Sequence, residues 1–402
     1  MYKHLKAKRE PKKNGPGTNH ISRVLQDNGI IFQFTRICID DFTSYHIRIR
    51  LNIAKLLTPG RKTSIYQLED YTEIWKNFYL CMSQALPQES QELADLDKWK
   101  TRRIDFCVQL SLCDVKTYIK LFQRGNKPSR GNYIIPYKPK NNDTRHIRID
   151  DELRKSHKPG SVYFLGGKYK TIPGKKKKKK ISLGSMIINI YDKQREMQSE
   201  KNNGRYTADE IDQEQNILRF EIQCLSKQID YLIKKYNLYE YIDGKKTKDK
   251  RLKNFLNPTI AKEIILSKYA DICGKGNYYK KSTALELIQD DKTIRNKDIL
   301  KDIVNLLNGT GGGRTIWKEY QRIKTKPTNH LLTPKQFKNG VKRLNDKGIN
   351  PITLKADYYL DELPSLYDVI DGYFDNLNNT VVNDEIIDYI AEEEIEELFD
   401  DE

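Results

Sequence analysis

Strict alternation of apolar and polar residues in three short stretches constrains the fold of this chain more than any other feature. The stretch at 185–196 reads SMIINIYDKQRE and, as a strand, divides into two faces. Its apolar face carries Met186, Ile188 and Ile190. Its polar face carries Asn189, Tyr191 and Lys193. We therefore predict a strand with one face in a core and a phenol and an ammonium group side by side on the other.

Two further stretches share this design. In the stretch at 102–110, Ile104, Phe106, Val108 and Leu110 alternate with Arg103, Asp105, Cys107 and Gln109. In the stretch at 216–224, Leu218, Phe220, Ile222 and Cys224 alternate with Arg219, Glu221 and Gln223. If the three strands lie in one sheet, helices such as those expected at 64–85 and 225–236 would cover the apolar face. The other face would then gather two carboxylates, a tyrosine, a lysine and two arginines.

The order of these patterns predicts an α+β fold in four parts. A basic, disordered arm is expected at 1–20, because it is rich in Lys, Arg, Pro and Gly. A sheet-based catalytic domain is expected at 21–240 and a mostly helical domain at 241–375. There, Thr333-Pro334 has the form of a helix N-cap and Gly348 that of a helix stop, which would suit a helix-turn-helix. An acidic tail at 376–402 would be a partner-binding helix or a mimic of DNA.

Net charge points to a polyanionic partner. The chain of 402 residues carries 72 Lys+Arg against 55 Asp+Glu, a formal charge of +17. Many of the acids lie in the tail, so the rest of the chain is more basic than this value. Nucleic acid is the commonest polyanion that such a protein meets. The alternative is a generally Lys-rich composition with a solvated surface. A run of six lysines is expected in a surface loop that contacts the DNA backbone: Lys175, Lys176, Lys177, Lys178, Lys179 and Lys180.

The polar face of the three strands carries groups suited to phosphate chemistry. Tyr191 is the candidate nucleophile and Lys193 its cationic neighbour. Asp105 and Glu221, with phosphate oxygens, are the ligands that Mg²⁺ or Mn²⁺ prefers. Arg103 and Arg219 would contact DNA. The alternative is that the three strands are ordinary half-buried strands with polar residues on their wet sides.

Other features narrow the setting. None of the six cysteines forms a C-x-x-C pair, and two of them lie in apolar strand patterns, so we expect reduced core cysteines. The first residues are charged and no apolar run approaches 18 residues. We therefore expect a cytoplasmic protein without a membrane partner. No H-x-H or H-x-x-x-H pair occurs among the six histidines, which disfavours a metal site built on a local histidine pair.

Several blocks of sequence together resemble the rolling-circle replication initiators, particularly the filamentous-phage gene II/X group, and the related plasmid Rep_trans initiators. The blocks lie in this order: RRIDF at 102–106, VYFLG at 162–166, INIYDKQRE at 188–196 and LRFEIQ at 218–223. LNIAKLL at 51–57 and LTPKQFKNGVKRLNDKGIN at 332–350 are also similar to blocks of the gene II group. The resemblance implies an antiparallel-sheet nuclease core, a degenerate form of the HUH/Rep fold, with helices on one face.

The resemblance also implies a site-specific DNA endonuclease and strand transferase of a phage or plasmid. It would bind the double-strand origin and cut one strand through Tyr191, leaving a 5′-phosphotyrosine and a free 3′-hydroxyl, and would religate at termination. Asp105 and Glu221 would be the metal ligands. A host helicase and polymerase would be partners, and a homodimer is one permitted assembly. Two alternatives stay open: a relaxase-like nickase for plasmid mobilisation, and a non-catalytic DNA-binding regulator.

Overall fold

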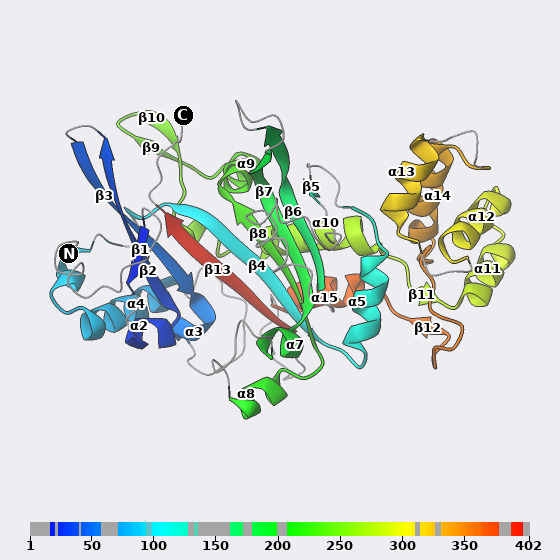
Figure 1. Cartoon of the computed structure of the whole chain (residues 1–402), viewed down its shortest axis with the longest axis horizontal. Helices are drawn as coiled ribbons and strands as arrows, with labels where there is room; N and C mark the ends of the chain where they lie inside the picture. The colour runs from blue at the N-terminus through cyan, green and yellow to red at the C-terminus, as the bar shows by residue number, and fades with distance from the viewer. Residues whose placement is uncertain are drawn as a thin grey trace.

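The computed structural model describes the chain in separate ranges. These are residues 17–20, 23–39, 42–57, 71–93, 95, 98–127, 133–134, 161–171, 179–198, 207–309, 314–325, 331–377 and 387–396. Helices and antiparallel strands are both present, so the predicted α+β class is confirmed at this level (Figure 1).

A nine-stranded sheet forms the centre of the molecule, with the order β1-β2-β3-β13-β4-β8-β7-β6-β5. Every neighbouring pair in it is antiparallel. Its strands are β1 (Gly17–His20), β2 (Ile30–Ile39), β3 (Phe42–Asn52), β4 (Thr101–Ser111), β5 (Tyr133–Ile134), β6 (Ser161–Thr171), β7 (Lys179–Asp192), β8 (Ile217–Leu225) and β13 (Ile387–Glu396). The three alternating stretches of the sequence are β4, β7 and β8, and they lie side by side as predicted.

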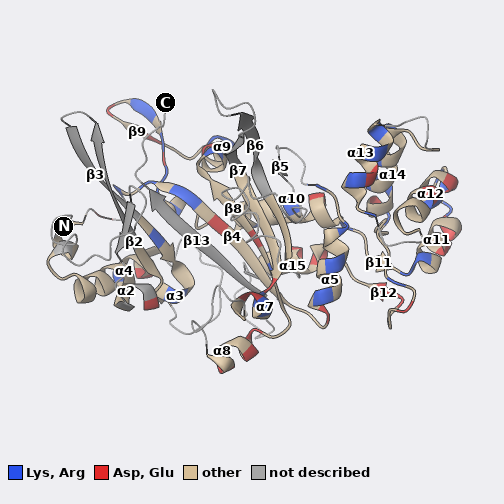
Figure 2. Cartoon of the chain, viewed as in Figure 1, with Lys and Arg blue, Asp and Glu red and all other residues tan. Residues whose placement is uncertain are grey.

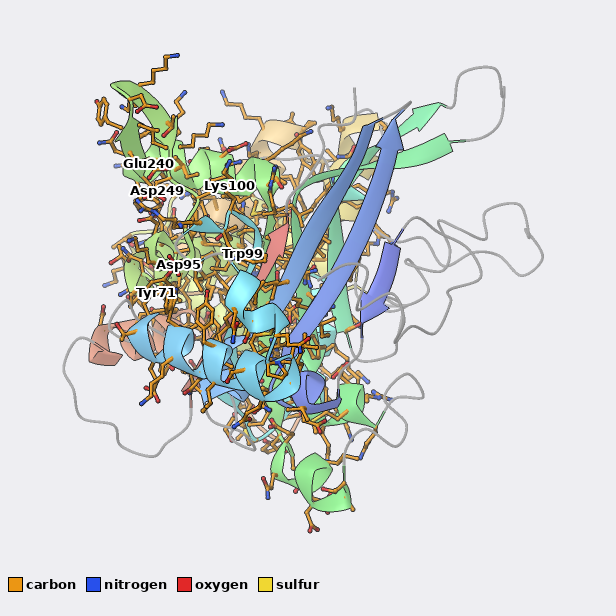
Figure 3. The ribbon with its side chains drawn as sticks, turned by 90° about the vertical axis from the view of Figure 1, so that its left-hand side faces the viewer. Tyr71, Asp95, Trp99, Lys100, Glu240 and Asp249 are labelled. Atoms are coloured by element: carbon orange, nitrogen blue, oxygen red, sulfur yellow. The ribbon has the colours of Figure 1, made fainter. Side chains whose placement is uncertain are left out.

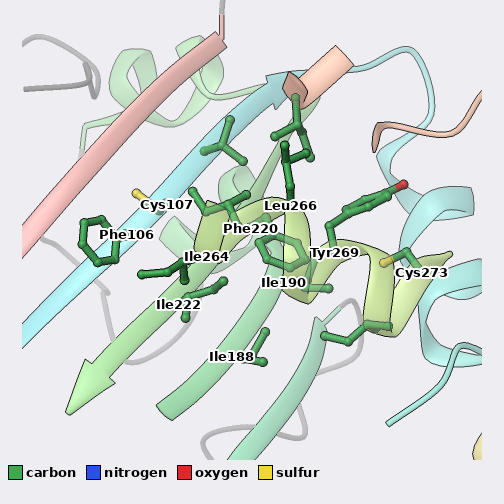
Figure 4. Packing of buried hydrophobic residues seen from close by; sticks show 14 of the residues in the cluster. Phe106, Cys107, Ile188, Ile190, Phe220, Ile222, Ile264, Leu266, Tyr269 and Cys273 are labelled. Carbon is green, nitrogen blue, oxygen red and sulfur yellow. The ribbon is translucent and has the colours of Figure 1, made fainter. Parts of the chain in front are cut away.

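Three helices cover the apolar face of these strands: α5 (Val115–Gln123), α9 (Ser226–Tyr236) and α10 (Pro258–Cys273). Figure 4 shows α10 across the strands, with Tyr269 close to Phe220. The ring centroids of these two residues are 6.0 Å apart. Ile188, Phe220 and Ile222 are at most 1% exposed. Burial of this face, at about 1.5–3 kcal/mol for each large side chain, fixes which way the polar face must point.

The first strands carry their own small helical cover. It consists of α2 (Arg23–Asp27), α3 (Ile53–Leu57) and α4 (Tyr71–Ala85), which pack together. The expected helix at 64–85 is therefore α4 from Tyr71 onward, and residues 64–70 lie outside the described ranges. Ile74 and Phe78 of α4 are fully buried. This helix packs with α2 and α3, however, and not on β4, β7 and β8.

The helical part of the chain follows α10. It contains α11 (Lys281–Asp290), α12 (Lys297–Leu307), α13 (Ile316–Thr325), α14 (Pro334–Asp346) and α15 (Tyr367–Leu377), with the short strands β11 (Tyr278–Tyr279) and β12 (Glu362–Leu363). Thr333 caps α14 through a reciprocal bond pair with Gln336, as its sequence predicted. Gly348 has φ +73°, the left-handed conformation that ends a helix.

A partly buried arginine joins the helical part to the end of α5, which packs on the sheet. Arg124 follows α5, and its guanidinium donates to the carbonyl oxygens of Thr353 (3.1 Å) and Leu307 (3.0 Å). The next residue, Gly125, has no room for a side chain, because a Cβ there would lie 2.2 Å from the Ile272 carbonyl oxygen. The amide of Ile316 donates to the Arg124 carbonyl (2.9 Å). These bonds fix α12 and α13 to the end of α5.

Four features differ from the sequence-based expectations. The expected boundary at 240–241 falls inside a hairpin of β9 (Tyr239–Ile242) and β10 (Lys245–Lys248), and α10, beyond it, packs on the sheet. The dipeptide Gly166-Gly167 predicts a turn, but β6 continues through it with an irregular register after Leu165. Two short helices, α7 (Lys193–Met197) and α8 (Ala208–Gln213), separate β7 from β8.

The fourth difference concerns the acidic tail. Residues 387–396 form a strand, β13, and not a helix. It pairs antiparallel with β3 on one side and with β4 on the other, so it lies inside the sheet (red in Figure 1). A tail strand therefore separates the first three strands from the five that include the candidate site.

No described helix has the length and apolarity to cross a bilayer.

Candidate active site

The polar face of β4, β8 and β7 brings together the residues that the alternation singled out. The strand register aligns Tyr191 with Arg219, and Arg219 with Gln109. The adjacent row aligns Glu221 with Asn189 and Cys107. Directly opposed residues of a sheet share a face, so the predicted gathering of these groups is observed.

Tyr191, Glu221 and Arg219 form a buried network. The Tyr191 hydroxyl donates to Glu221 Oε2 over 3.3 Å, and Arg219 Nε donates to the same oxygen over 3.2 Å. Gln223 Nε2 donates to the other oxygen, Oε1, over 2.7 Å. Tyr191 is 9% exposed and Arg219 is 3% exposed. One carboxylate therefore holds a phenol and a guanidinium at the same atom.

Glu221 stays ionised in spite of its burial. Desolvation raises the pKa of this carboxyl, whereas the charge of Arg219 and the hydrogen bond from Gln223 lower it. The charges of Arg103 and Lys193 act in the same direction, so the pKa of Glu221 lies below its ordinary value. The face therefore has a permanent anion surrounded by three cations.

Asp105 forms a second ion pair on the same face. Arg103 Nε donates to Asp105 Oδ1 over 2.7 Å, and the Arg103 Nη2 group contacts the other carboxylate oxygen. Asp105 is 1% exposed, whereas the side chain of Arg103 is 21% exposed. Both predicted DNA-binding arginines are thus engaged with the carboxylates beside them. Of the two, only Arg103 has appreciable exposure for an additional contact.

The sequence analysis placed Lys193 wrongly. β7 ends at Asp192, which caps α7 by accepting a bond from the amide of Arg195 (3.1 Å), so Lys193 is the first residue of a helix. Its ammonium lies 3.7 Å from the Glu196 carboxylate. Lys193 therefore does not share a strand face with Tyr191. The charge of Lys193 nevertheless reaches Glu221, as the lowered pKa of that carboxyl shows. An Asp at 192 favours this N-cap, a signal that was present in the sequence.

The two carboxylates do not form a ready metal site. All four oxygens of Asp105 and Glu221 already accept bonds from side chains within the face. Among the described residues, no group of three or more His, Cys, Asp and Glu is placed to hold a metal ion. The arrangement fits an ionic network better than a metal centre.

Other site residues fall at the limits of the described chain or were not singled out. Lys175, Lys176, Lys177 and Lys178 lie outside the described ranges, and Lys179 and Lys180 are the first residues of β7, in register with Thr171 and Lys170.

Sequence reasoning missed the part played by two glutamines. Gln223 binds Glu221, and Gln109 Oε1 accepts from Arg219 Nη1 over 3.4 Å. Their signal was their place on the two polar strand faces.

Comparison with known proteins gives no match: no family model, no curated protein and no solved structure matches this chain.

Proposed function

We propose that this chain is a DNA-nicking and strand-transferring enzyme that starts rolling-circle replication, with Tyr191 as its nucleophile. The observation that carries the proposal is the contact of the Tyr191 hydroxyl with Glu221, 3.3 Å away, inside a cluster of cations. The resemblance of the sequence blocks to replication initiators and the net charge of +17 support it. The same blocks support an antiparallel-sheet nuclease core for the strands that hold the site.

The proposed step balances within the observed network. Tyr191 Oη attacks the phosphorus of a DNA phosphodiester, the P–O3′ bond breaks, and the 5′ side becomes a phosphotyrosine. The phenol proton passes to Glu221, and the released 3′ oxygen takes a proton from water. Arg219 and Lys193 supply positive charge for the phosphorane-like transition state. Contact of Arg219 with phosphate would weaken its bond to Glu221 and so make that carboxylate a better base.

The released 3′-hydroxyl is a primer end for a host polymerase, and a host helicase would open the duplex ahead of it. Reversal of the same step religates the strand at termination. Because Tyr191 is 9% exposed, a phosphodiester reaches it only when the polar face becomes accessible. A requirement for Mg²⁺ or Mn²⁺ stays a prediction of the resemblance, and adding EDTA to the assay below tests it separately.

Replacing Tyr191 with Phe tests the nucleophile. The variant removes one oxygen and the hydrogen bond to the ionised Glu221, so its free energy of unfolding should fall by about 1.5–3 kcal/mol. Covalent attachment to a labelled single-stranded origin fragment should be lost entirely. The measurement is a denaturing gel, followed by peptide mapping of the wild-type adduct.

Tyr163→Phe is the matched control. Tyr163 lies on the neighbouring strand, in register with Asn189, and is partly buried. This variant should form the adduct at the wild-type rate. An adduct that maps to Tyr163, or one that persists in Tyr191→Phe, would reject Tyr191 as the nucleophile.

A second candidate function is supported by the burial of the site. Asp105, Arg219 and Glu221 are at most 6% exposed as residues, and each is held by a partner of the same face. Such a network also suits a structural scaffold in a DNA-binding regulator that performs no chemistry. Under this alternative, the wild-type protein binds DNA but forms no covalent adduct with any strand, in magnesium or in manganese.

A further inference from the structure

The β9–β10 hairpin projects beyond the large sheet and the helices that cover it (Figure 1). Its register aligns Tyr239 with Lys248, and Tyr241 with Lys246. Aligned residues share a face, so one face of this ribbon consists of two tyrosines and two lysines. The opposite face carries Glu240, Ile242, Lys245 and Thr247.

The tyrosine–lysine face is open to solvent at its outer end. Tyr241 is 73% exposed, and the side chain of Lys248 is 47% exposed. The Lys246 ammonium lies 4.2 Å from the ring centroid of Tyr239. A large exposed aromatic ring leaves apolar surface in contact with water unless a partner covers it. This face therefore calls for a functional explanation.

The hairpin is rigid, which favours a binding role over that of a flexible linker. Its turn has two residues, Asp243 with φ 49° and Gly244 with φ 75°, the conformation of the tightest hairpins. At the base, Arg251 pairs with Glu240 (3.1 Å) and with Asp249. The Thr101 amide donates to the Lys250 carbonyl over 2.8 Å, which attaches the base to the start of β4. Figure 3 shows Glu240 and Asp249 near Lys100 and above Trp99.

The charges of the hairpin are unevenly satisfied. Lys248 and Lys250 share Asp230, at 3.0 Å and 3.1 Å. Lys245 and Lys246 have no carboxylate partner among the described residues. Both lysines lie next to the turn, Lys246 on the face of Tyr241 and Lys245 on the opposite face (Lys and Arg are blue in Figure 2). The outer end of the ribbon therefore offers a free aromatic surface and uncompensated positive charge together.

We propose that the face formed by Tyr239, Tyr241, Lys246 and Lys248 binds single-stranded DNA. Exposed rings on which bases stack, next to cations that follow the phosphates, are the chemistry by which proteins hold a single strand. This contact surface adds to the proposed function. It depends on that function only in one respect, that the chain acts on DNA. Tyr191 is aligned with Gln109, whereas the hairpin is attached at Thr101, about 26 Å away along β4. The hairpin would thus hold a strand at a distance from the cut.

Tyr241→Ser tests the stacking contact. Affinity of the full chain for fluorescently labelled oligothymidylate, measured by anisotropy, should fall about 5- to 150-fold, the range for loss of one stacked base. Tyr241→Phe keeps the ring and should restore wild-type affinity. Tyr231→Ser is the matched control, since Tyr231 is 48% exposed on α9 and should leave affinity unchanged. Equal affinities of Tyr241→Ser and Tyr231→Ser would overturn the proposal.

The double variant Lys246→Ser/Lys248→Ser tests the charges of the tyrosine–lysine face. The slope of log affinity against log salt should become shallower by about 1.4, because two phosphate contacts are lost on a single strand. Lys116→Ser/Lys120→Ser removes the same charge from the exposed face of α5 and should leave the slope unchanged. An equal change of slope in both double variants would show a general charge effect and reject the site.

Two further readouts separate this proposal from neighbouring ones. If Tyr241→Ser weakens binding of duplex DNA as much as binding of oligothymidylate, the assignment to single strands is wrong. The rate of covalent attachment to a short fragment that spans only the cleavage position should not change in Tyr241→Ser. Failure of the Tyr191 mechanism would remove the adduct from every variant and leave the oligothymidylate result intact.

Discussion

Glu221 is the residue on which the polar face depends. Its carboxylate binds Tyr191, Arg219 and Gln223 at once, and its charge balances cations from three elements. A buried ion pair of this kind is weak support for stability in itself, because desolvation opposes the attraction. Breaking it from one side is different, since the remaining charge stays buried without compensation.

Glu221→Gln should therefore be strongly destabilising at neutral pH. We expect the free energy of unfolding to fall by about 3–5 kcal/mol, because Arg219 stays buried opposite a neutral amide. Urea denaturation at pH 7, followed by circular dichroism, measures this. Glu196→Gln is the control: its pair with Lys193 is 3.7 Å long and 30% exposed on the acid side, so its loss should cost about 1 kcal/mol or less.

The same variant has a defined pH dependence. Because the pKa of Glu221 is lowered in the folded state, the stability that its charge contributes is fully present above the ordinary glutamate pKa of about 4.3. It is lost as the pH falls through the lower folded-state pKa. The stability difference between wild type and Glu221→Gln should thus be constant from pH 7 to about 5 and shrink toward pH 3. A difference that does not change over this range would show that Glu221 is not the ionised group.

At the scale of elements, two helical glycines lie in opposite surroundings. Gly340 on α14 faces α12, and a Cβ there would lie 2.2 Å from Ile303 Cδ1. Gly372 on α15 has nothing within 4 Å of its Cβ position. Both would gain helix propensity as alanine, by about 0.5–1 kcal/mol. Only at Gly340 does packing oppose that gain.

Gly372→Ala should therefore stabilise the protein by about 0.5–1 kcal/mol, and Gly340→Ala should destabilise it by about 1–3 kcal/mol, because α12 and α14 must separate or repack. Thermal unfolding of the two variants beside wild type measures both. A stabilised Gly340→Ala would mean that Ile303 moves aside at little cost, and that the contact between α12 and α14 tolerates an added methyl group.

The sequence allowed the elements of the site to be predicted better than their connections. Alternation predicted β4 and β8, and β7 from Ser185 to Tyr191, because burial of one face selects residues with a period of two. The prediction of a loop for the lysine run was wrong at Lys179 and Lys180, which are the first residues of β7. It also assigned Asp105, Tyr191 and Glu221 to one face. It could not predict that each carboxylate pairs with the arginine two residues before it, since ion pairing depends on side-chain conformation. The placement of Lys193 was wrong because the strand alternation was extended past Asp192, which is the N-cap of α7.

Strand order was the part that sequence could not supply. Nothing local distinguishes an acidic strand from an acidic helix when the segment also carries evenly spaced Ile and Tyr, and β13 was interpreted as a tail for that reason. Its neighbours β3 and β4 are far from it in the chain, so their pairing is a long-range property. The helix α10 was likewise assigned to the helical domain, because its apolar residues are not confined to one face and do not reveal which layer it covers.

At the scale of the whole molecule, removal of β13 should have a visible cost. Without it, β3 and β4 each present an unpaired edge in the middle of the sheet. Free edges of this kind pair with other chains. A chain truncated after Leu377 should unfold at lower temperature and self-associate in a concentration-dependent way, as measured by analytical ultracentrifugation.

The acidic residues of the tail allow a separate measurement beside this truncation. If their charge competes with DNA for the basic residues of the rest of the chain, truncation should also tighten non-specific DNA binding. A full-length variant with Glu392 and Glu394 changed to Gln keeps the strand and removes charge. Tighter DNA binding in this variant, without self-association, would separate the electrostatic effect from the structural one. A truncated chain that stays monomeric with wild-type stability would reject the role of β13 in the sheet.

The position of β13 also sets an order of events during synthesis. β4 is complete once Ser111 has been made, but the strand that joins it to β3 begins only at Ile387, after every other described element. At roughly 5–20 residues per second, this interval lasts tens of seconds. The nascent chain must therefore keep two partial sheets apart while both wait for the same strand. Folding of this protein should depend more on chaperones that shield strand edges than folding of a protein whose central strands are neighbours in sequence.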